Sequence, residues 1–137
     1  MGLNKKERVI TLQEIWKDIK GYDGLYQVSN FGRVKSLKRV IIKKNNQKQI
    51  VYMKILKHRK DRDGYLQTRL FKNGKLKVFY LHRLVAIAFI PNPYNKLEVN
   101  HINHIRDDCN LTNLEWITHL ENIRSRRKTI KTQLNSC

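Results

Sequence analysis

The sequence predicts an α+β protein with an N-terminal antiparallel β-sheet module, then a strand–loop–strand–helix unit, and finally a basic C-terminal helix or tail. Three observations support this: apolar residues alternate between Gly-containing turns up to about residue 81, helical spacing begins at His82, and a capping box occupies Thr118–Glu121. We therefore divide the 137 residues into a polar arm (1–13), a β-rich module (14–81), a second unit (82–124) and a basic tail (125–137).

The β-rich module is expected to begin with short strands near residues 25–28 and 34–37. Asp23-Gly24 and Asn30-Phe31-Gly32 interrupt the apolar pattern, and Asn and Gly tolerate the positive φ of tight turns. The lysine-rich stretch from Lys38 to Lys48 is expected to be a charged, mobile loop. The module therefore consists of short strands and tight turns.

A β-hairpin is predicted at the end of the module, where residues 65–72 and 76–81 flank Asn73-Gly74. This dipeptide is the strongest short hairpin signal. Two sets of residues alternate along the first strand of the hairpin, so one face of the hairpin should be exposed to water. The first set is Tyr65, Gln67, Arg69 and Phe71, and the second is Leu66, Thr68 and Leu70.

The second unit starts with a helix over residues 82–90, which Pro91 and Pro93 end because proline cannot continue a helix. Strands are expected at residues 99–102 and 114–117. Thr118 and Glu121 can each satisfy a free backbone donor at a helix start, so a further helix should begin at about His119. The order from residue 99 onward is strand, long loop, strand and helix.

The chain is strongly basic, with 29 Lys plus Arg against 11 Asp plus Glu and a net charge of +18. Self-repulsion on this scale is costly without a polyanionic partner, and nucleic acid is the usual one. The segment 98–122 is the exception, because it has a net charge of −4 and contains only one base, Arg106. That segment suits a bound cation, and a solvated acidic loop is the alternative explanation of its charge. Its acids are Glu98, Asp107, Asp108, Glu115 and Glu121.

Several classes of protein are disfavoured by simple counts. The longest apolar run, residues 84–90, has seven residues, whereas a membrane helix needs about 20. The start of the chain is charged and no apolar region follows it, so no secretory signal is expected. Cys109 and Cys137 lack a CxxC pair, which favours free thiols without a disulfide partner in a reducing compartment. We expect a cytoplasmic protein.

The acidic segment also contains side chains suited to hydrolytic chemistry. Histidine can deprotonate water near neutral pH, and oxygen ligands suit a hard cation such as Mg²⁺. A strand with His101 packed against a helix with Asn122 would bring a base and a ligand together, although each residue alone is more simply structural. A zinc site is a rival, but only His101 and His104 are closely spaced and strand alternation should separate them. Its candidate ligands are His82, His101, His104, His119 and Cys109.

Three motifs follow one another in the second unit: Asn100-His101, then Asn113-Leu-Glu-Trp-Ile-Thr, then Glu121-Asn122. Together they resemble the nuclease core of HNH endonucleases, and His82-Arg-Leu-Val-Ala resembles the lead-in to that core. Upstream, residues 16–34 (Trp-Lys-Asp-Ile-Lys-Gly-Tyr-Asp-Gly-Leu-Tyr-Gln-Val-Ser-Asn-Phe-Gly-Arg-Val) are similar to the nuclease-associated module of phage and intron-encoded homing endonucleases. The resemblance implies a ββα-metal finger and a metal-dependent DNA endonuclease.

The resemblance also implies roles for individual residues. His101 is expected to be the general base that activates water, and Asn113 to brace the loop through backbone hydrogen bonds. Asn100 and Asn122 are expected to hold a divalent metal ion, Mg²⁺ or alternatively Mn²⁺. The family often has Asp where this chain has Asn100, so metal binding by the neutral pair is expected to depend on the substrate phosphate.

Double-stranded DNA is the implied partner, bound by a monomer or a homodimer. Basic side chains on the sheet could follow a DNA groove, although a plain solvent-exposed face predicts the same pattern. The candidate DNA-binding residues are Arg33, Lys35, Arg69, Arg83, Arg124 and Arg126. Two alternatives stay open: a cleavage-deficient DNA-binding regulator of the same fold, which the neutral ligand pair suggests, and a basic RNA-associated structural protein.

Overall fold

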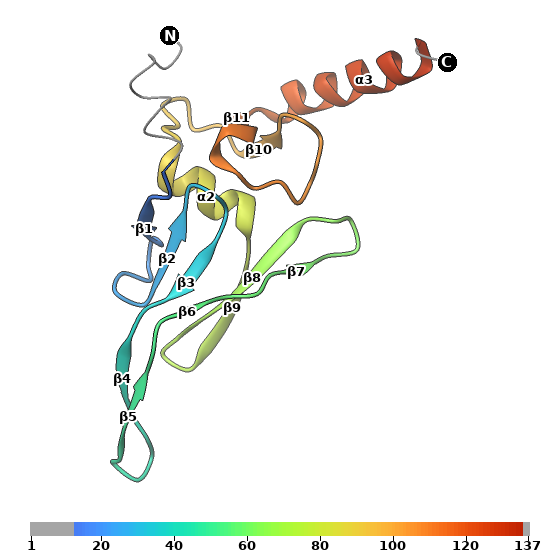
Figure 1. Ribbon diagram of the computed structural model, residues 1–137. Coiled ribbons are helices and arrows are strands. Elements are labelled where there is room, and N and C mark those ends of the chain that lie inside the picture. Colours follow the sequence, from blue (N-terminus) through green and yellow to red (C-terminus); the bar gives the residue numbers. More distant parts are fainter. Residues whose placement is uncertain (1–12, 136–137) are drawn as a thin grey trace.

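The computed structural model describes residues 13–135, so nearly all of the expected polar arm lies outside the described residues. Antiparallel strands and two helices confirm the α+β class (Figure 1). The strands of the first half are β1 (Trp16–Asp18), β2 (Tyr26–Ser29), β3 (Val34–Ser36), β4 (Arg39–Ile42), β5 (Lys48–Val51), β6 (Lys54–Ile55), β7 (Arg59–Lys60), β8 (Leu66–Lys72) and β9 (Lys75–Tyr80). They are followed by α2 (Leu81–Phe89), β10 (Glu98–His101), a 3₁₀ turn η1 (Leu111–Asn113), β11 (Leu114–Ile117) and α3 (His119–Asn135).

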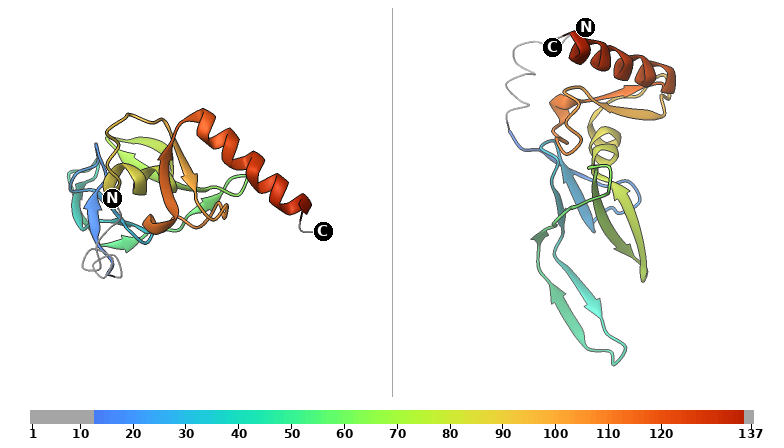
Figure 2. Two further views of the ribbon diagram at one scale, coloured as in Figure 1. Left: turned by 90° about the horizontal axis from the view of Figure 1, so that it is seen from above. Right: turned by 90° about the vertical axis from the view of Figure 1, so that its right-hand side faces the viewer.

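The strands form four small sheets in the described part of the chain. One sheet has the order β1-β2-β3-β6 and another has the order β7-β8-β9, while β4 pairs with β5 and β10 pairs with β11. All of these pairings are antiparallel. Figure 2 shows that the β4–β5 hairpin and α3 project from opposite ends of the molecule.

Helix α2 is the element around which the core is built. It contacts β2, β8, β9, β10 and β11, so it joins the N-terminal sheets to the second unit. Leu81 and Val85 of α2, Val28 and Val34 of the first sheet, and Leu70 of β8 have no exposed surface. Burial of each such side chain stabilises the fold by about 1.5–3 kcal/mol. The helical spacing predicted from His82 onward therefore identified the centre of the molecule.

A tight backbone contact fixes the long loop of the second unit against the N-terminal sheet. Gly32 has a φ of +79°, and a Cβ built on it would lie 2.8 Å from the carbonyl oxygen of Cys109. Close by, the backbone N–H of Leu111 donates to the carbonyl of Asn30 at 2.8 Å. Only glycine combines this conformation with this approach, so the turn at residue 32 holds the loop that follows β10.

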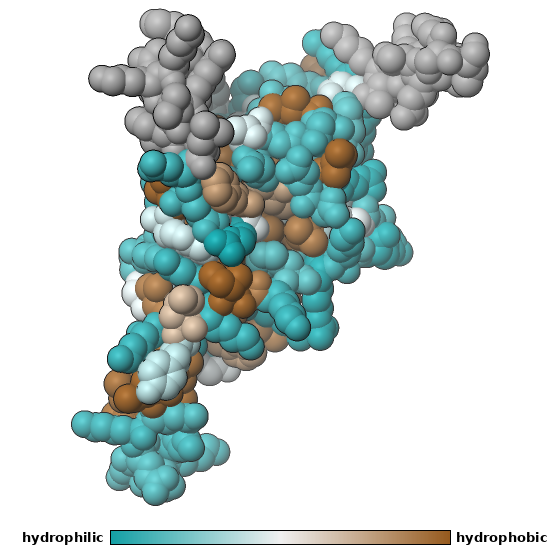
Figure 3. Space-filling model, viewed as in Figure 1, coloured by the Kyte–Doolittle hydropathy of each residue, from teal (hydrophilic) through white to brown (hydrophobic). Residues whose placement is uncertain are grey.

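The prediction of a mobile loop from Lys38 to Lys48 is wrong. Most of this stretch belongs to the hairpin formed by β4 and β5, in which Val40 lies opposite Ile50. Asn46 has a φ of 60° and closes the turn, where its N–H donates to the carbonyl of Lys43 at 2.9 Å. The sequence pattern did not predict this pairing, because lysines flank the short apolar runs of the two strands. Figure 3 shows hydrophobic side chains on this hairpin above a hydrophilic tip.

The predicted hairpin on either side of Asn73-Gly74 is confirmed as β8 and β9. Asn73 and Gly74 have φ values of 52° and 73°, as a type I′ turn requires. Thr68 and Leu70 are buried while Arg69 and Phe71 are exposed, so the predicted wet face is also present. The outer face of this hairpin therefore exposes both a basic side chain, Arg69, and an apolar one, Phe71, to solvent.

Helix α3 begins where the capping box predicted. The N–H of Thr118 donates to Oε2 of Glu121 at 3.0 Å, and the N–H of Glu121 donates to Oγ1 of Thr118 at 3.2 Å. The helix continues as far as Asn135, through most of the segment expected as a tail. No helix between residues 13 and 135 has the length and apolar character needed to cross a membrane.

Candidate functional site

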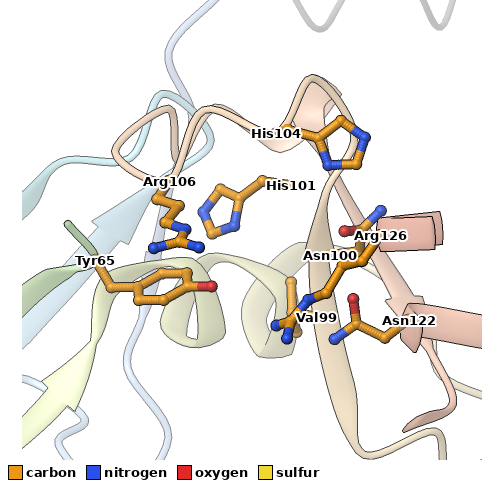
Figure 4. A pocket seen from close by; sticks show the side chains of 8 residues that line it. All are labelled: Tyr65, Val99, Asn100, His101, His104, Arg106, Asn122 and Arg126. Carbon is orange, nitrogen blue, oxygen red and sulfur yellow. The ribbon is translucent and has the colours of Figure 1, made fainter. Parts of the chain in front are cut away.

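An open pocket of about 330 Å³ lies between β10, the first turns of α3, the loop after β10 and the end of the β7–β8 turn (Figure 4). Its lining contains His101 together with Asn100 and Asn122, the base and the metal ligands expected from the sequence. The full lining is Tyr65, Val99, Asn100, His101, His104, Arg106, Asn122 and Arg126. Polar side chains from separate segments thus converge on one site.

Asn100 and His101 are neighbours, yet both line the pocket, because the strand ends at His101. Asn100 lies opposite Glu115 and His101 lies opposite Leu114 in the β10–β11 ladder. The chain then turns, and the N–H of His104 donates to the carbonyl of His101 at 2.9 Å. His104 has a φ of 60°, so strand alternation does not apply to it. Both histidines line the pocket, but Figure 4 shows the ring of His101 directed toward Arg106 and that of His104 directed to the other side.

His101 is largely buried, with 5% of its surface exposed. Its ring centroid lies 4.8 Å from that of His82 and 5.7 Å from that of Tyr65. Burial lowers the pKa of His101, the charge of Arg106 lowers it further, and Asp108 and Asp107 oppose the change. A histidine with a lowered pKa is neutral at pH 7 and can accept a proton.

His82 is the second residue of α2, and its ring packs against the ring of His101. The Nδ1 of His82 is buried without a hydrogen-bond partner among the described residues. The ring instead packs against those of His101, Tyr65 and Tyr80, with centroids 4.8–5.5 Å apart. Burial, together with the charges of His101 and Arg83, lowers the pKa of His82 to about 4, and the charge of Asp61 partly opposes this change.

Acid is expected to destabilise the fold through His82. Its pKa is about 4 in the folded protein and 6.5 in the unfolded chain, so the unfolded chain takes up the proton first as the pH falls. The free energy of unfolding should fall by about 3 kcal/mol between pH 7 and pH 4 from this group alone. Urea unfolding of wild type and His82→Phe at both pH values measures the effect, since other groups cancel in the comparison. Equal losses in the two proteins would contradict the prediction.

Asn113 does not line the pocket, and 7% of its surface is exposed. Its Oδ1 accepts a hydrogen bond from the N–H of Asn103 at 2.9 Å, and its Nδ2 donates to the carbonyl of Asp108 at 2.9 Å. Its own carbonyl accepts from the N–H of Ile102 at 2.8 Å. These backbone contacts join the two ends of the loop that follows His101.

Two carboxylates orient the amides of Asn100 and Asn122. Nδ2 of Asn122 donates to Oε2 of Glu98 at 2.6 Å, and Nδ2 of Asn100 donates to Oε1 of Glu115 at 2.9 Å. The other oxygen of Glu98 lies 2.6 Å from Nδ1 of His119. The hydrogen bond from Asn122, followed by that from His119, lowers the pKa of Glu98. A carboxylate that holds Nδ2 leaves the amide oxygen as the donor atom for a cation.

The donor set of the pocket suits a hard cation better than zinc. Among the described residues, no three His, Cys, Asp or Glu side chains are grouped closely enough to hold a metal ion. Cys109 is buried outside the pocket, and burial, with Asp108 and Asp107, raises its pKa to about 12. Amide oxygens such as those of Asn100 and Asn122 are ligands for Mg²⁺, which keeps several waters. These residues therefore fit a hydrated divalent cation.

The expected DNA-binding residues are distributed over the molecule. Arg126 lines the pocket, and Arg83 lines a neighbouring one, where its Nη1 donates to the carbonyl of Leu97 at 2.8 Å. Arg33 and Lys35 lie over the ring of Trp16, and Arg33 also pairs with Glu14. Arg69 is exposed on β8 and Arg124 on α3. The structure thus brings only some of them to the pocket.

Sequence reasoning missed Tyr65, Arg106 and Glu98 as parts of this site. Tyr65 belongs to the β-rich module and contacts His82 and His101 from far along the chain. No local sequence pattern predicts such a contact. The role of Glu98 beside Asn100 could have been predicted, because residues 98 and 100 lie on the same face of a strand. Arg106 was visible as the single base in an acidic segment.

Comparison with known proteins places this geometry in a family. Residues 14–71 match the NUMOD4 motif, and residues 79–124 match the HNH endonuclease family. The DNA endonuclease I-HmuI of Bacillus phage SP01 is 44% identical over 110 residues, which is 80% of this chain and 56% of that protein. An uncharacterised HNH endonuclease of Acanthamoeba polyphaga mimivirus is 43% identical over 76 residues, covering 56% of this chain and 23% of its own length.

A solved structure shares the fold. The structure described as "DNA binding and cleavage by the HNH homing endonuclease I-HmuI" superposes with a TM-score of 0.69 at 39% identity, covering 89% of this chain and 66% of that one. The chain spans about half the length of I-HmuI and a quarter of the mimivirus protein. Both motif matches occur in the order that the sequence predicted, and together they cover most of the chain. The protein carries a NUMOD4 motif followed by an HNH endonuclease domain.

Proposed function

We propose that this protein is a metal-dependent endonuclease that hydrolyses phosphodiester bonds in double-stranded DNA. The observation that carries the proposal is the convergence of His101, Asn100 and Asn122 on one open pocket. The printed name of the phage relative, a DNA endonuclease, supports the same activity. A base and a cation site in a basic protein are the parts that phosphodiester hydrolysis requires.

We assign the role of general base to His101. Its Nε2 is buried, and we assign the contact with a water molecule in the pocket to the other ring nitrogen, Nδ1. The water oxygen bonds to phosphorus, its proton passes to His101, and the bond from phosphorus to one bridging oxygen breaks. The lowered pKa of His101 keeps the ring neutral and ready for this proton. The buried stack with His82 and Tyr65 holds the ring in one orientation.

Asn100 and Asn122 would hold a divalent cation, with Mg²⁺ preferred and Mn²⁺ as an alternative. When bound, the cation supplies positive charge that stabilises the phosphate as bonds change. Asn122 keeps its oxygen available because Glu98 accepts from its Nδ2, and Glu115 does the same for Asn100. Both ligands are neutral, so the substrate phosphate is expected to complete the site. Asn113 would brace the loop that positions His101.

The charge of the protein supports a duplex as substrate. A net charge of +18 favours a polyanion, and each phosphate neutralised by Lys or Arg releases counterions. Arg83 lies on α2, and Arg124 and Arg126 lie on α3, while Lys35 and Arg69 lie on β3 and β8 and Arg33 directly precedes β3. One pocket cuts one strand, so we propose a monomer that nicks or a homodimer that breaks both strands inside a phage- or intron-bearing cell.

The decisive experiment is a nicking assay on supercoiled plasmid DNA. Wild-type protein with Mg²⁺ or Mn²⁺ should convert plasmid to open circle or linear form, and EDTA should stop the conversion. The metal dependence follows from the need for a cation at Asn100 and Asn122. A preparation that binds DNA yet leaves the plasmid supercoiled with both metals would overturn the proposed activity.

A cleavage-deficient DNA-binding regulator is the second candidate, and the neutral Asn pair is the observation that favours it. Such a protein would bind DNA without metal, and its affinity would fall steeply between ~50 and ~200 mM salt. Binding measured with and without EDTA distinguishes the two functions when it is combined with the plasmid assay.

A further inference from the structure

We propose that Arg106 is a further catalytic residue, whose guanidinium binds a non-bridging oxygen of the phosphodiester that is cut. This assignment rests on the proposed endonuclease function. Arg106 lines the pocket together with His101, Asn100 and Asn122. Figure 4 shows Arg106 and Tyr65 on one side of His101, and Asn100 and Asn122 on the other. A phosphate above His101 would therefore meet the cation ligands on one side and a guanidinium on the opposite side.

The guanidinium of Arg106 is held in place before any substrate binds. Its Nη1 donates to the carbonyl of Asp63 at 2.7 Å, and its Cζ lies 5.1 Å from the ring centroid of Tyr65. The stem passes over Gly64, where a built Cβ would lie 4.0 Å from Cδ of the arginine. A side chain fixed in this way loses little conformational entropy when it binds a phosphate.

The turn that holds Arg106 is itself rigid. Oδ1 of Asp61 accepts hydrogen bonds from the N–H groups of Asp63 and Tyr65, both at 2.9 Å. The N–H of Gly64 donates to the carbonyl of Asp61 at 3.1 Å. This turn leads into β8 and belongs to the NUMOD4 match, which ends at residue 71. The β-rich module therefore contributes directly to the pocket, because its turn holds the guanidinium of Arg106, a residue of the second unit.

The charge of Arg106 is not cancelled by a neighbour. No carboxylate lies within 4.0 Å of its guanidinium among the side chains that the structure describes. A carbonyl and an aromatic face leave the positive charge intact, and a guanidinium has further N–H donors in a planar fork that matches a phosphate. Arg33 differs in this respect, because it forms an ion pair with Glu14.

A purely structural role for Arg106 makes a different prediction. As a clamp, Arg106 would only attach the loop after β10 to the β7–β8 turn. That loop has other attachments, among them the ion pair between Lys60 and Asp107 at 2.8 Å and the backbone contacts of Asn113. Loss of Arg106 should therefore leave the loop in place and remove positive charge from the pocket.

The test compares Arg106→Ala, Arg106→Lys and Arg62→Ala with wild type. Arg62 is exposed in the same turn and lines neither the pocket nor its neighbour, so it controls for the loss of one positive charge. Single-turnover cleavage at saturating enzyme should be about 10²–10³-fold slower for Arg106→Ala. The dissociation constant for DNA should change as little as it does for Arg62→Ala, and the midpoint of thermal unfolding should stay near that of wild type.

Arg106→Lys keeps the positive charge, the long aliphatic stem and hydrogen-bond donors, so it covers the case in which Arg106→Ala unfolds. It should remain folded yet cut at least about tenfold more slowly, because an ammonium lacks the planar fork. Equal saturating rates for wild type and Arg106→Ala would overturn the assignment and leave the proposed function standing. A loss confined to DNA affinity and matched by Arg62→Ala would overturn it as well. A wild type that does not cut would overturn both.

Discussion

His101→Ala is expected to lower the single-turnover rate of DNA cleavage by about 10²–10⁴-fold, the usual contribution of a positioned general base. The ring sits at the end of β10, where it is 5% exposed and packed against His82 and Tyr65. Its removal leaves the attacking water without a proton acceptor at that point. DNA affinity should hardly change, because a neutral side chain that is largely buried takes little part in counterion release. Plasmid nicking and a binding titration on the same preparation separate the two quantities.

His104→Ala is the matched control for that variant. His104 lines the same pocket and is the same type of residue, but it is exposed on the turn after the strand. Its substitution should slow cleavage much less than that of His101. If the two variants show the opposite order, the general base is His104. If both cut at the wild-type rate, the base lies elsewhere in the pocket.

Local sequence signals predicted the elements of the second unit closely, because each of those elements depends on neighbouring residues. The capping box fixed the start of α3, Pro91 and Pro93 marked the end of α2, and the strand over 114–117 matches β11. The β4–β5 hairpin was missed because its strands are exposed and rich in lysine, so they lack the alternation of a half-buried sheet.

The site was predictable only in part, and for a different reason. His101, Asn100 and Asn122 were predicted from the resemblance to the HNH motifs, and all three line the pocket. Strand alternation does not decide the orientation of His104, because β10 ends three residues earlier, at His101. Tyr65 and the turn that holds Arg106 reach the site through packing of distant segments around α2, and the sequence has no periodic signal for that contact.

Asn122→Ala is expected to slow cleavage by on the order of 100-fold and to raise the Mg²⁺ concentration needed for half-maximal rate. The physical reason is the loss of the amide oxygen that Glu98 orients through Nδ2, at 2.6 Å. The rate is measured on plasmid DNA across a range of Mg²⁺ concentrations. If both the rate and the half-maximal concentration stay at their wild-type values, Asn122 is not a ligand.

The partner of Asn122 allows a sharper version of this experiment. Asn122→Asp supplies a charged ligand, yet it should also slow cleavage, because one of its oxygens would face the carboxylate of Glu98. Glu98→Gln alone should weaken metal binding by up to about 10–100-fold, because it leaves one acceptor oxygen for Asn122 and His119 in place of the two carboxylate oxygens. When the two substitutions are combined, position 98 carries an amide donor and position 122 a carboxylate acceptor. The double variant should therefore cut faster than Asn122→Asp alone. Additive losses would show that Glu98 does not orient the ligand, because coupled residues depart from additivity.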